Sequence, residues 1–234
     1  MTTITHRGRR GEARTSTTEA VEDYAKAIFS LQGHEGGAAS TTALADRVGV
    51  SPASVSAMVK RLAELGLVEH EPYHGVRLTP AGDRVALEVI RHHRLLEAYL
   101  SEALGMPWDR VHAEAEVLEH YLSEELEELI ALKLGDPALD PHGDPIPDRD
   151  LTLPTERTRA LADLEPGEHG TFTRVSDSNS DMLRYLSEQH VRPGMTLRVE
   201  DKQPFGGPVF VDVGGRVLAL GGALARSMRV AVHS

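Results

Sequence analysis

Residues 40–62 read STTALADRVGVSPASVSAMVKRL and decide the fold of the N-terminal part of the chain. Their apolar side chains recur at helical spacing on both sides of Gly49, which predicts two short helices joined by a tight turn. Ser51 is a good N-cap for the second helix, and Pro52 suits its first position. The stretch therefore predicts a helix-turn-helix.

The neighbouring segments complete a winged helix-turn-helix. Helix signals run upstream from residue 17 to about Leu31, and residues 66–79 read as two short strands around a turn, which is a wing. In such a motif the start of the second helix reaches base edges in the major groove, and basic side chains contact phosphates. The candidate DNA-binding residues are Arg47, Ser51, Pro52, Ala53, Ser54, Ser56, Lys60, Arg61 and Arg77.

Charge is divided unequally along the chain. Residues 1–80 hold 9 Lys+Arg and 9 Asp+Glu, whereas residues 81–234 hold 16 and 27, so the net charge of −11 lies entirely in the later part. A protein charged in this way binds DNA poorly unless bound cations offset the charge or fix the geometry. Plain solubility charge is the other interpretation of the same numbers.

The composition excludes several kinds of site and location. The chain has no cysteine, which removes disulfides, zinc–thiolate sites and cysteine nucleophiles. Its apolar stretches are far shorter than the roughly 20 residues that span a membrane. The basic N-terminus is not followed by an apolar region, so it does not read as a signal peptide. We expect a cytoplasmic protein.

The whole chain is expected to be mainly α with a small β part. One helix is predicted from residue 80 to about residue 101, and a Glu-rich helix from Asp109 to Leu134. Later, short apolar runs separated by glycine turns predict a small SH3-like β-barrel. The expected parts are a disordered basic arm (1–16), the winged helix-turn-helix (17–80), a helical dimerisation and metal-binding domain (81–147), a linker (148–164) and the barrel (165–234).

Histidine and glutamate recur at helical spacing on two of the expected helices. His93 and Glu97 are four residues apart on the first helix and therefore share a face. Four more such residues fall within one broad face of the second helix, namely His112, Glu116, Glu119 and His120. One His–Glu pair is more often a solvated helix face, but six donors on two successive helices favour a divalent-metal site with nitrogen and oxygen ligands.

These residues carry a family resemblance. From about residue 17 to residue 147 the chain resembles the diphtheria toxin repressor family of metal-dependent regulators, which includes the manganese transport regulators. The part after residue 165 resembles the SH3-like third domain of that family. The resembling segments are residues 22–24, 50–68, 78–82, 92–97, 116–123 and 142–147.

The resemblance implies homodimers on a palindromic DNA operator and two metal sites per subunit. The primary site would comprise Asp23, Glu116, Glu119 and His120. The ancillary site would comprise His93, Glu97 and His112, with an oxygen ligand from the third domain. The region 176–181 matches the source of that last ligand, and Asp181 is the expected residue.

Departures from the family pattern bear on the choice of metal. Iron-responsive members carry Met and Cys where this chain has Asp23 and Glu116, and hard oxygen donors favour manganese(II). Short manganese regulators carry a glutamate three residues after the first-helix aspartate. Lys26 occupies that position here, so their closely spaced binuclear site is not expected. Manganese(II) is the expected effector, and an iron(II)-dependent repressor of the same family is the alternative.

A metal shared by Asp23 and the later helices would tie the DNA-binding domain to the dimerisation helices and hold the recognition helices at the operator spacing. Two other classes of protein stay open. One is a metallohydrolase built on the His/Glu cluster, although the sequence names no nucleophile or substrate loop. The other is a winged-helix protein that mediates protein contacts. We expect no enzyme activity, no membrane partner and no small organic substrate.

Overall fold

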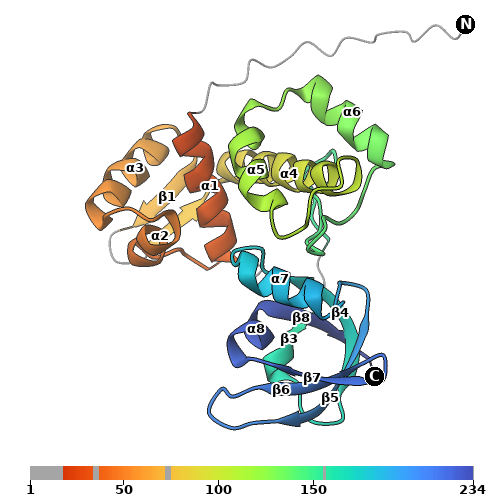
Figure 1. Cartoon of the computed structure of the whole chain (residues 1–234). Helices are drawn as coiled ribbons and strands as arrows, with labels where there is room; N and C mark the ends of the chain where they lie inside the picture. The colour runs from red at the N-terminus through yellow and green to blue at the C-terminus, as the bar shows by residue number, and fades with distance from the viewer. Residues whose placement is uncertain (1–17, 34–36, 72–74, 155–156, 234) are drawn as a thin grey trace, which may run out of the picture. The chain divides into compact units, whose positions relative to one another are not determined.

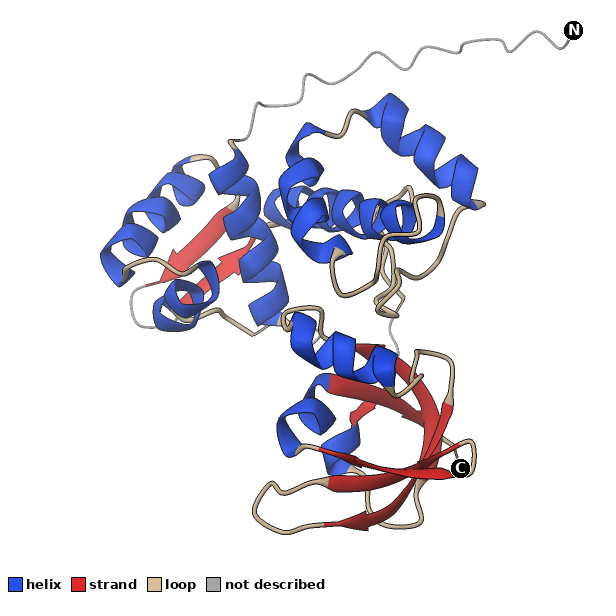
Figure 2. Cartoon of the chain, in the orientation of Figure 1, coloured by secondary structure: helices blue, strands red, loops and turns tan. Residues whose placement is uncertain are grey.

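A computed structural model describes residues 18–33, 37–71, 75–154 and 157–233 of the chain. It separates into two compact units, Met1–Ala86 and Leu87–Ser234, and within these described ranges strands occur only in the wing and in the C-terminal sheet (Figure 1, Figure 2). The predicted basic arm and the tip of the wing lie outside the described residues. Within the described ranges, none of the helices combines the length and hydropathy that a membrane span requires.

The N-terminal unit is a winged helix-turn-helix, as predicted. Its elements are α1 (Glu19–Gln32), α2 (Thr41–Val48), α3 (Pro52–Glu64), β1 (Val68–Glu71) and β2 (Gly75–Leu78), the two strands being antiparallel. The side chains of Ser40 and Ser51 cap α2 and α3 by accepting backbone amide hydrogen bonds. Gly49 ends α2 in the left-handed conformation, with φ of 72°, which glycine adopts without steric cost.

One apolar core unites the three helices and both strands of this unit. Val55, Val59 and Leu62 of α3 point into that core and are fully or almost fully buried. Because these three positions face inward, the intervening residues of α3 are turned toward solvent. The packing thus presents one face of the second helix of the motif, which is the face that a helix-turn-helix offers to DNA.

The second unit starts inside α4, because Ala86 still packs in the core of the first unit. Its helical part consists of α4 (Pro80–Glu102), α5 (Val111–Leu118), the 3-10 turn η1 (Glu119–Tyr121) and α6 (Glu124–Leu134). The single helix predicted over Asp109–Leu134 is wrong. The chain becomes extended at Leu122, and the Ser123 side chain caps α6 by accepting from the amide of Leu126. Acidic residues in the first turn of α6 favour this new helix start.

The C-terminal part of this unit is the SH3-like sheet domain that was predicted. Its elements are β3 (Arg159–Ala160), η2 (Leu161–Asp163), β4 (His169–Val175), α7 (Ser180–Glu188), β5 (Thr196–Lys202), β6 (Val209–Val213), β7 (Arg216–Leu220), α8 (Gly222–Ser227) and β8 (Met228–Val232). The antiparallel strand order is β3-β8-β4-β5-β6-β7. The domain begins before the expected boundary at residue 165, because Leu161 and Leu164 are completely buried in its core.

Candidate metal centre

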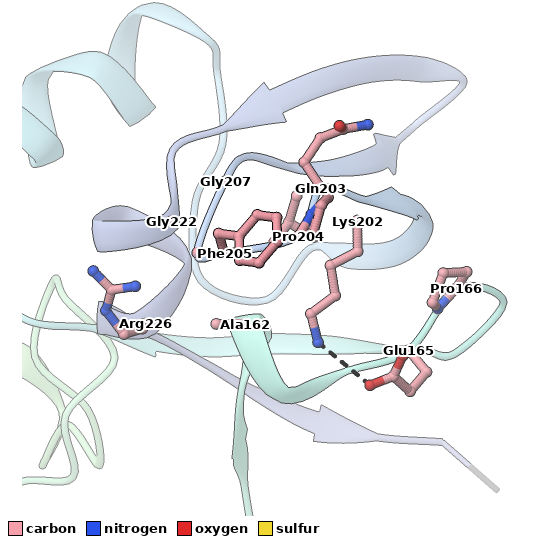
Figure 3. A pocket seen from close by; sticks show the side chains of 12 residues that line it. Ala162, Glu165, Pro166, Lys202, Gln203, Pro204, Phe205, Gly207, Gly222 and Arg226 are labelled. Atoms are coloured by element: carbon pink, nitrogen blue, oxygen red, sulfur yellow. Dashed lines mark hydrogen bonds and ion pairs between the residues drawn. The ribbon is translucent and has the colours of Figure 1, made fainter.

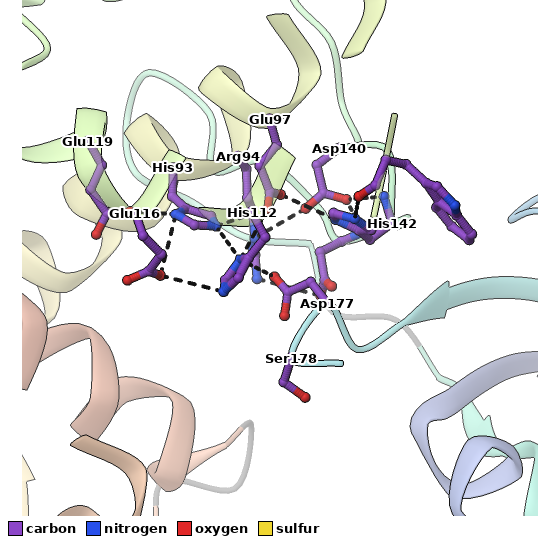
Figure 4. A network of polar contacts seen from close by, with 12 residues as sticks. His93, Arg94, Glu97, His112, Glu116, Glu119, Asp140, His142, Asp177 and Ser178 are labelled. Carbon is purple, nitrogen blue, oxygen red and sulfur yellow. Dashed lines mark hydrogen bonds and ion pairs between the residues drawn. The ribbon is translucent and has the colours of Figure 1, made fainter. Parts of the chain in front are cut away.

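Buried histidine and carboxylate side chains converge in the second unit, where α4 and α5 meet the segments around residues 140–142 and 177 (Figure 4). His93 and Glu97 lie one turn apart on α4 and are 4% and 0% exposed. The Nε2 atom of His93 lies 3.0 Å from Oε1 of Glu97 and 3.1 Å from Nδ1 of His112 on α5. The structure therefore brings together the three helical residues expected in the ancillary site.

The sheet domain contributes Asp177 to this group, and not the expected Asp181. Oδ2 of Asp177 lies 3.1 Å from Nδ1 of His112. The side chain of Asp181 is 85% exposed and pairs with Arg184. Asn179 caps α7 by accepting from the amide of Asp181, which places Asp181 in the first turn of that helix. The expectation of Asp181 is corrected to Asp177, since only the latter lies at the cluster.

Two further donors come from the crossing segment between α6 and β3, and sequence reasoning missed both. Asp140 and His142 are 7% and 0% exposed. Nδ1 of His142 lies 3.4 Å from Oε2 of Glu97, and among the described residues neither atom has a hydrogen-bond partner. Oδ1 of Asp140 accepts from the amide of His142 at 2.8 Å. The sequence offers one signal for His142, which is the first residue of the family-like stretch 142–147.

A second group of donors lies beside the first, around η1. The buried carboxylate of Glu119 accepts a hydrogen bond from Nδ1 of His93, and Oε1 of Glu116 lies 3.7 Å from the same nitrogen. Nε2 of His120 lies 3.7 Å from Oε1 of Glu119. The two ring nitrogens of His93 thus face different groups. Asp23, the remaining residue of the expected primary site, belongs to α1 of the other unit, and its part in the site stays a prediction.

The electrostatics of the buried group centre on Glu97. Burial raises its pKa, but contacts with His112, His142 and His93 outweigh burial and hold the pKa of Glu97 well below its usual value. Hydrogen bonding to Asp177, and then to Glu97, raises the pKa of His112 to about 10. Burial lowers the pKa of His142, yet the nearby carboxylate of Glu97 more than offsets it, so that this pKa is about 9. Near neutral pH, His112 and His142 therefore carry protons.

The chemistry of these donors fits a divalent cation. Three sets within the second unit have ligand atoms within 4.8 Å of one another, namely His93, Glu97, His112 and Asp177; His93, Glu116 and Glu119; and Glu97, Asp140 and His142. All the donors are imidazole nitrogens and carboxylate oxygens, which suit manganese, iron and zinc. The buried Nδ1 of His142 and Oε2 of Glu97 face each other at 3.4 Å as an ion pair, and among the described residues neither atom has another partner.

The candidate DNA-binding residues all lie on exposed parts of the N-terminal unit. The serine hydroxyls at the start of α3 are bonded locally. The Ser51 and Ser54 hydroxyls are 2.9 Å apart, and the Ser56 hydroxyl donates to the carbonyl of Pro52 at 2.9 Å. Lys60 lies 4.0 Å from Glu64 on the solvent side of the helix, a weak pair that phosphate can replace.

A separate hollow of about 380 Å³ lies on the sheet domain (Figure 3). Its lining includes the exposed ring of Phe205 and the cations of Lys202 and Arg226. Its single carboxylate, from Glu165, pairs with Lys202 at 3.3 Å. This hollow therefore lacks the converging carboxylates and imidazoles that the cluster around Glu97 offers to a cation.

Comparison with known proteins gives three family matches along the chain. Residues 16–76 match the N-terminal DNA binding domain of iron dependent repressors. Residues 79–148 match their metal binding and dimerisation domain, and residues 159–232 match the FeoA domain. The start of the third match coincides with the start of β3.

Individual relatives match over almost the whole chain. The diphtheria toxin repressor of Corynebacterium efficiens is 30% identical over 223 residues, covering 91% of this chain and 95% of that protein. The iron-dependent repressor IdeR of Mycobacterium leprae is 28% identical over 224 residues, covering 91% and 96%. A solved structure described as a manganese-dependent transcriptional repressor in complex with manganese is 41% identical, with a TM-score of 0.86, covering 91% of this chain and 100% of that chain.

These matches confirm the predicted class of regulator and set aside the metallohydrolase. The matched domains indicate DNA binding and homodimer formation. The chain therefore belongs to the iron-dependent repressor family, which includes the diphtheria toxin repressor, and is a metal-dependent transcriptional repressor and not an enzyme.

Proposed function

We propose that this repressor responds to manganese(II), binds a palindromic operator as a homodimer and controls genes of metal uptake or homeostasis. The donor set is the observation that carries the proposal, because it consists of carboxylate oxygens and imidazole nitrogens without sulfur. Hard cations such as manganese(II) prefer such ligands. The 41% identical structure described as a manganese-dependent repressor with manganese supports the same choice. Iron(II) is the alternative, which the relatives named as iron-dependent favour.

Two metal sites per subunit are part of the proposal. The first would be held by Asp23, Glu116, Glu119 and His120. The second would be held by His93, Glu97, His112 and Asp177, with Asp140 and His142 as further donors beside Glu97. In each site a bound cation supplies positive charge that offsets the gathered carboxylates. Binding would also displace the protons that His112 and His142 carry.

Regulation would follow from the distribution of these ligands between the units. Asp23 belongs to the DNA-binding unit, whereas Glu119 and His120 belong to the unit that carries the dimerisation domain. Ligands shared in this way favour the one arrangement of the units in which all of them reach the cation. If that arrangement is the one that fits DNA, metal and operator each strengthen the binding of the other.

The homodimer has a suitable surface on the helical part. Large apolar side chains on α5, η1 and α6 are exposed, although the same helices bury their opposite faces. These exposed residues are Val117, Leu118, Tyr121, Leu126, Leu129 and Leu132. A surface patch of this kind is typical of a subunit interface. The twofold symmetry of such a dimer matches the symmetry of a palindromic operator.

Fluorescence anisotropy of a labelled palindromic promoter fragment tests the proposal. The protein is titrated with Mn(II), anaerobic Fe(II) and Zn(II), with a chelator as control. We expect DNA binding only with metal, and activation by Mn(II) at about micromolar free concentration. Asp23→Ala and Glu116→Ala should abolish the metal dependence while the fold persists, whereas Glu114→Ala, an exposed neighbour on α5, should behave like the natural protein.

Each contrary result has a defined meaning. DNA binding that persists in excess chelator would refute metal sensing. Activation by Fe(II) at lower free concentration than Mn(II) would select the iron alternative. Unchanged metal dependence in both the Asp23 and Glu116 variants would refute the proposed first site.

A further inference from the structure

Trp108 links the helical part of the second unit to the sheet domain. It lies in the turn between α4 and α5, yet its ring is 5% exposed and packs in the apolar core of the sheet domain with Leu161 and Phe172. The other buried members of that core come from residue 161 onward. The sole tryptophan of the chain is therefore anchored in a domain that begins some fifty residues later.

The same tryptophan holds His142 in two ways. The two rings are stacked, with centroids 5.7 Å apart and planes inclined by 23°. Nε2 of His142 also lies 2.7 Å from the backbone oxygen of Trp108, and since a carbonyl only accepts, Nε2 is the protonated donor. This hydrogen bond leaves Nδ1 of His142 facing Oε2 of Glu97 at 3.4 Å.

A residue of the sheet domain also contacts the ring of Trp108. The guanidinium carbon of Arg192 lies 4.0 Å from the centre of the indole ring, a cation–π contact. Among the described residues the indole N–H has no hydrogen-bond partner, so packing, stacking and this cation hold the ring. The position of the ring therefore depends on the sheet domain being docked.

Strand β4 also contacts the segment that contains His142. The amide of Val175 donates to the carbonyl of His142 at 3.0 Å. Gly143 has φ of 89°, and a Cβ atom there would lie 1.9 Å from the carbonyl oxygen of Thr173, so no side chain fits between them. His142 thus lies between β4 and Trp108.

We infer that Trp108 is a positioning residue, held by Arg192, through which docking of the sheet domain turns Nδ1 of His142 toward Glu97. The contacts themselves require no metal. The consequence for metal binding rests on the proposed second site, because the docked sheet domain then supplies Asp177 directly and His142 through Trp108. Under this arrangement, docking of the sheet domain and tight cation binding at the second site occur together.

Manganese(II) binding to the full chain, followed by the electron paramagnetic resonance signal of the free ion, measures the consequence. Trp108→Leu removes the flat ring and should weaken the second site about tenfold or more, as loss of an outer-shell partner does. Arg192→Gln should weaken it about two- to fivefold. Trp108→Phe should restore most of the affinity. Arg184→Gln is the matched control, because Arg184 also faces the α4–α5 turn, through Asp109 at 3.5 Å, and should change affinity less than about twofold.

Nitrogen-15 NMR of the histidine side chains in chelator-treated protein tests the positioning without metal. In the natural protein and in Trp108→Phe, the proton on Nε2 of His142 should exchange slowly with water, because it is held by the carbonyl of residue 108. Trp108→Leu and Arg192→Gln should lose that slow exchange. If Trp108→Leu unfolds the sheet domain, Arg192→Gln decides the question.

The two measurements separate the inference from the proposed function. A natural protein that binds only one manganese(II) per subunit would refute the proposed second site, while the NMR result would still decide the role of Trp108. An unchanged His142 signal in Trp108→Leu and Arg192→Gln, or second-site affinity in both within about twofold of the natural protein, overturns the inference.

Discussion

Binding of a divalent cation at the proposed second site should release a number of protons that can be measured. The pKa of His112 is about 10 and that of His142 about 9, so near neutral pH each ring carries a proton where a cation needs a lone pair. A cation that uses both rings displaces about two protons below pH 9 and about one between pH 9 and 10. The apparent affinity should therefore rise about a hundredfold per pH unit below pH 9, and about tenfold per unit between 9 and 10.

Calorimetric titration with manganese(II) at about pH 7.5, in buffers of different ionisation enthalpy, counts the protons. The first site adds a constant number, so the informative quantity is the difference between variants. His112→Gln and His142→Gln should each release about one proton fewer than the natural protein. His169→Gln is the control, since His169 is exposed at the start of β4, and it should leave the count unchanged.

Two results would refute this reasoning. One is a natural protein whose affinity for manganese(II) at the second site does not rise between about pH 7 and pH 8.5. The other is equal proton counts in the natural protein and in both glutamine variants at saturation. Either result would mean that His112 or His142 is not protonated in the metal-free protein, or that the cation does not use these rings.

Three further predictions concern single positions. Gly143→Ala should lower the free energy of unfolding by about 3 kcal/mol or more in urea titrations. Gly167 also has positive φ but has open space around it, so Gly167→Ala should lower the free energy of unfolding by only about 1 kcal/mol. Equal losses in the two variants would contradict the steric argument. Ser123→Ala should cost about 1 kcal/mol in the same assay, because α6 loses its cap, and no loss would mean that the cap contributes nothing. Lys60→Ala should reduce by about one the slope of the logarithm of DNA affinity against the logarithm of salt concentration. Lys133→Ala, on α6, should leave this slope unchanged. An unchanged slope in Lys60→Ala would mean that Lys60 does not contact a phosphate.

Most predictions that depend on near neighbours in the sequence agreed with the structure, and the single helix over Asp109–Leu134, which ends at Tyr121 and restarts after the Ser123 cap, is the exception. The two helices around Gly49, the cap at Ser51 and the shared face of His93 and Glu97 each depend on residues no more than four positions apart. Spacing and capping act over that range, so the backbone alone determines which side chains meet. The winged helix-turn-helix and the α4 residues of the candidate metal centre could therefore be predicted without a structure.

The contacts that complete the centre join residues far apart in the chain. Glu97 meets His142, and His112 meets Asp177, only because the crossing segment and the sheet domain pack against α4 and α5. Asp181 looked equivalent to Asp177 in the sequence, but the cap of α7 turns it to solvent. The sequence by itself determined the winged helix-turn-helix, the small C-terminal sheet domain and the shared helical face of His93 and Glu97. The tertiary structure decided which loop donors reach them, because that choice depends on packing between segments that local spacing does not constrain.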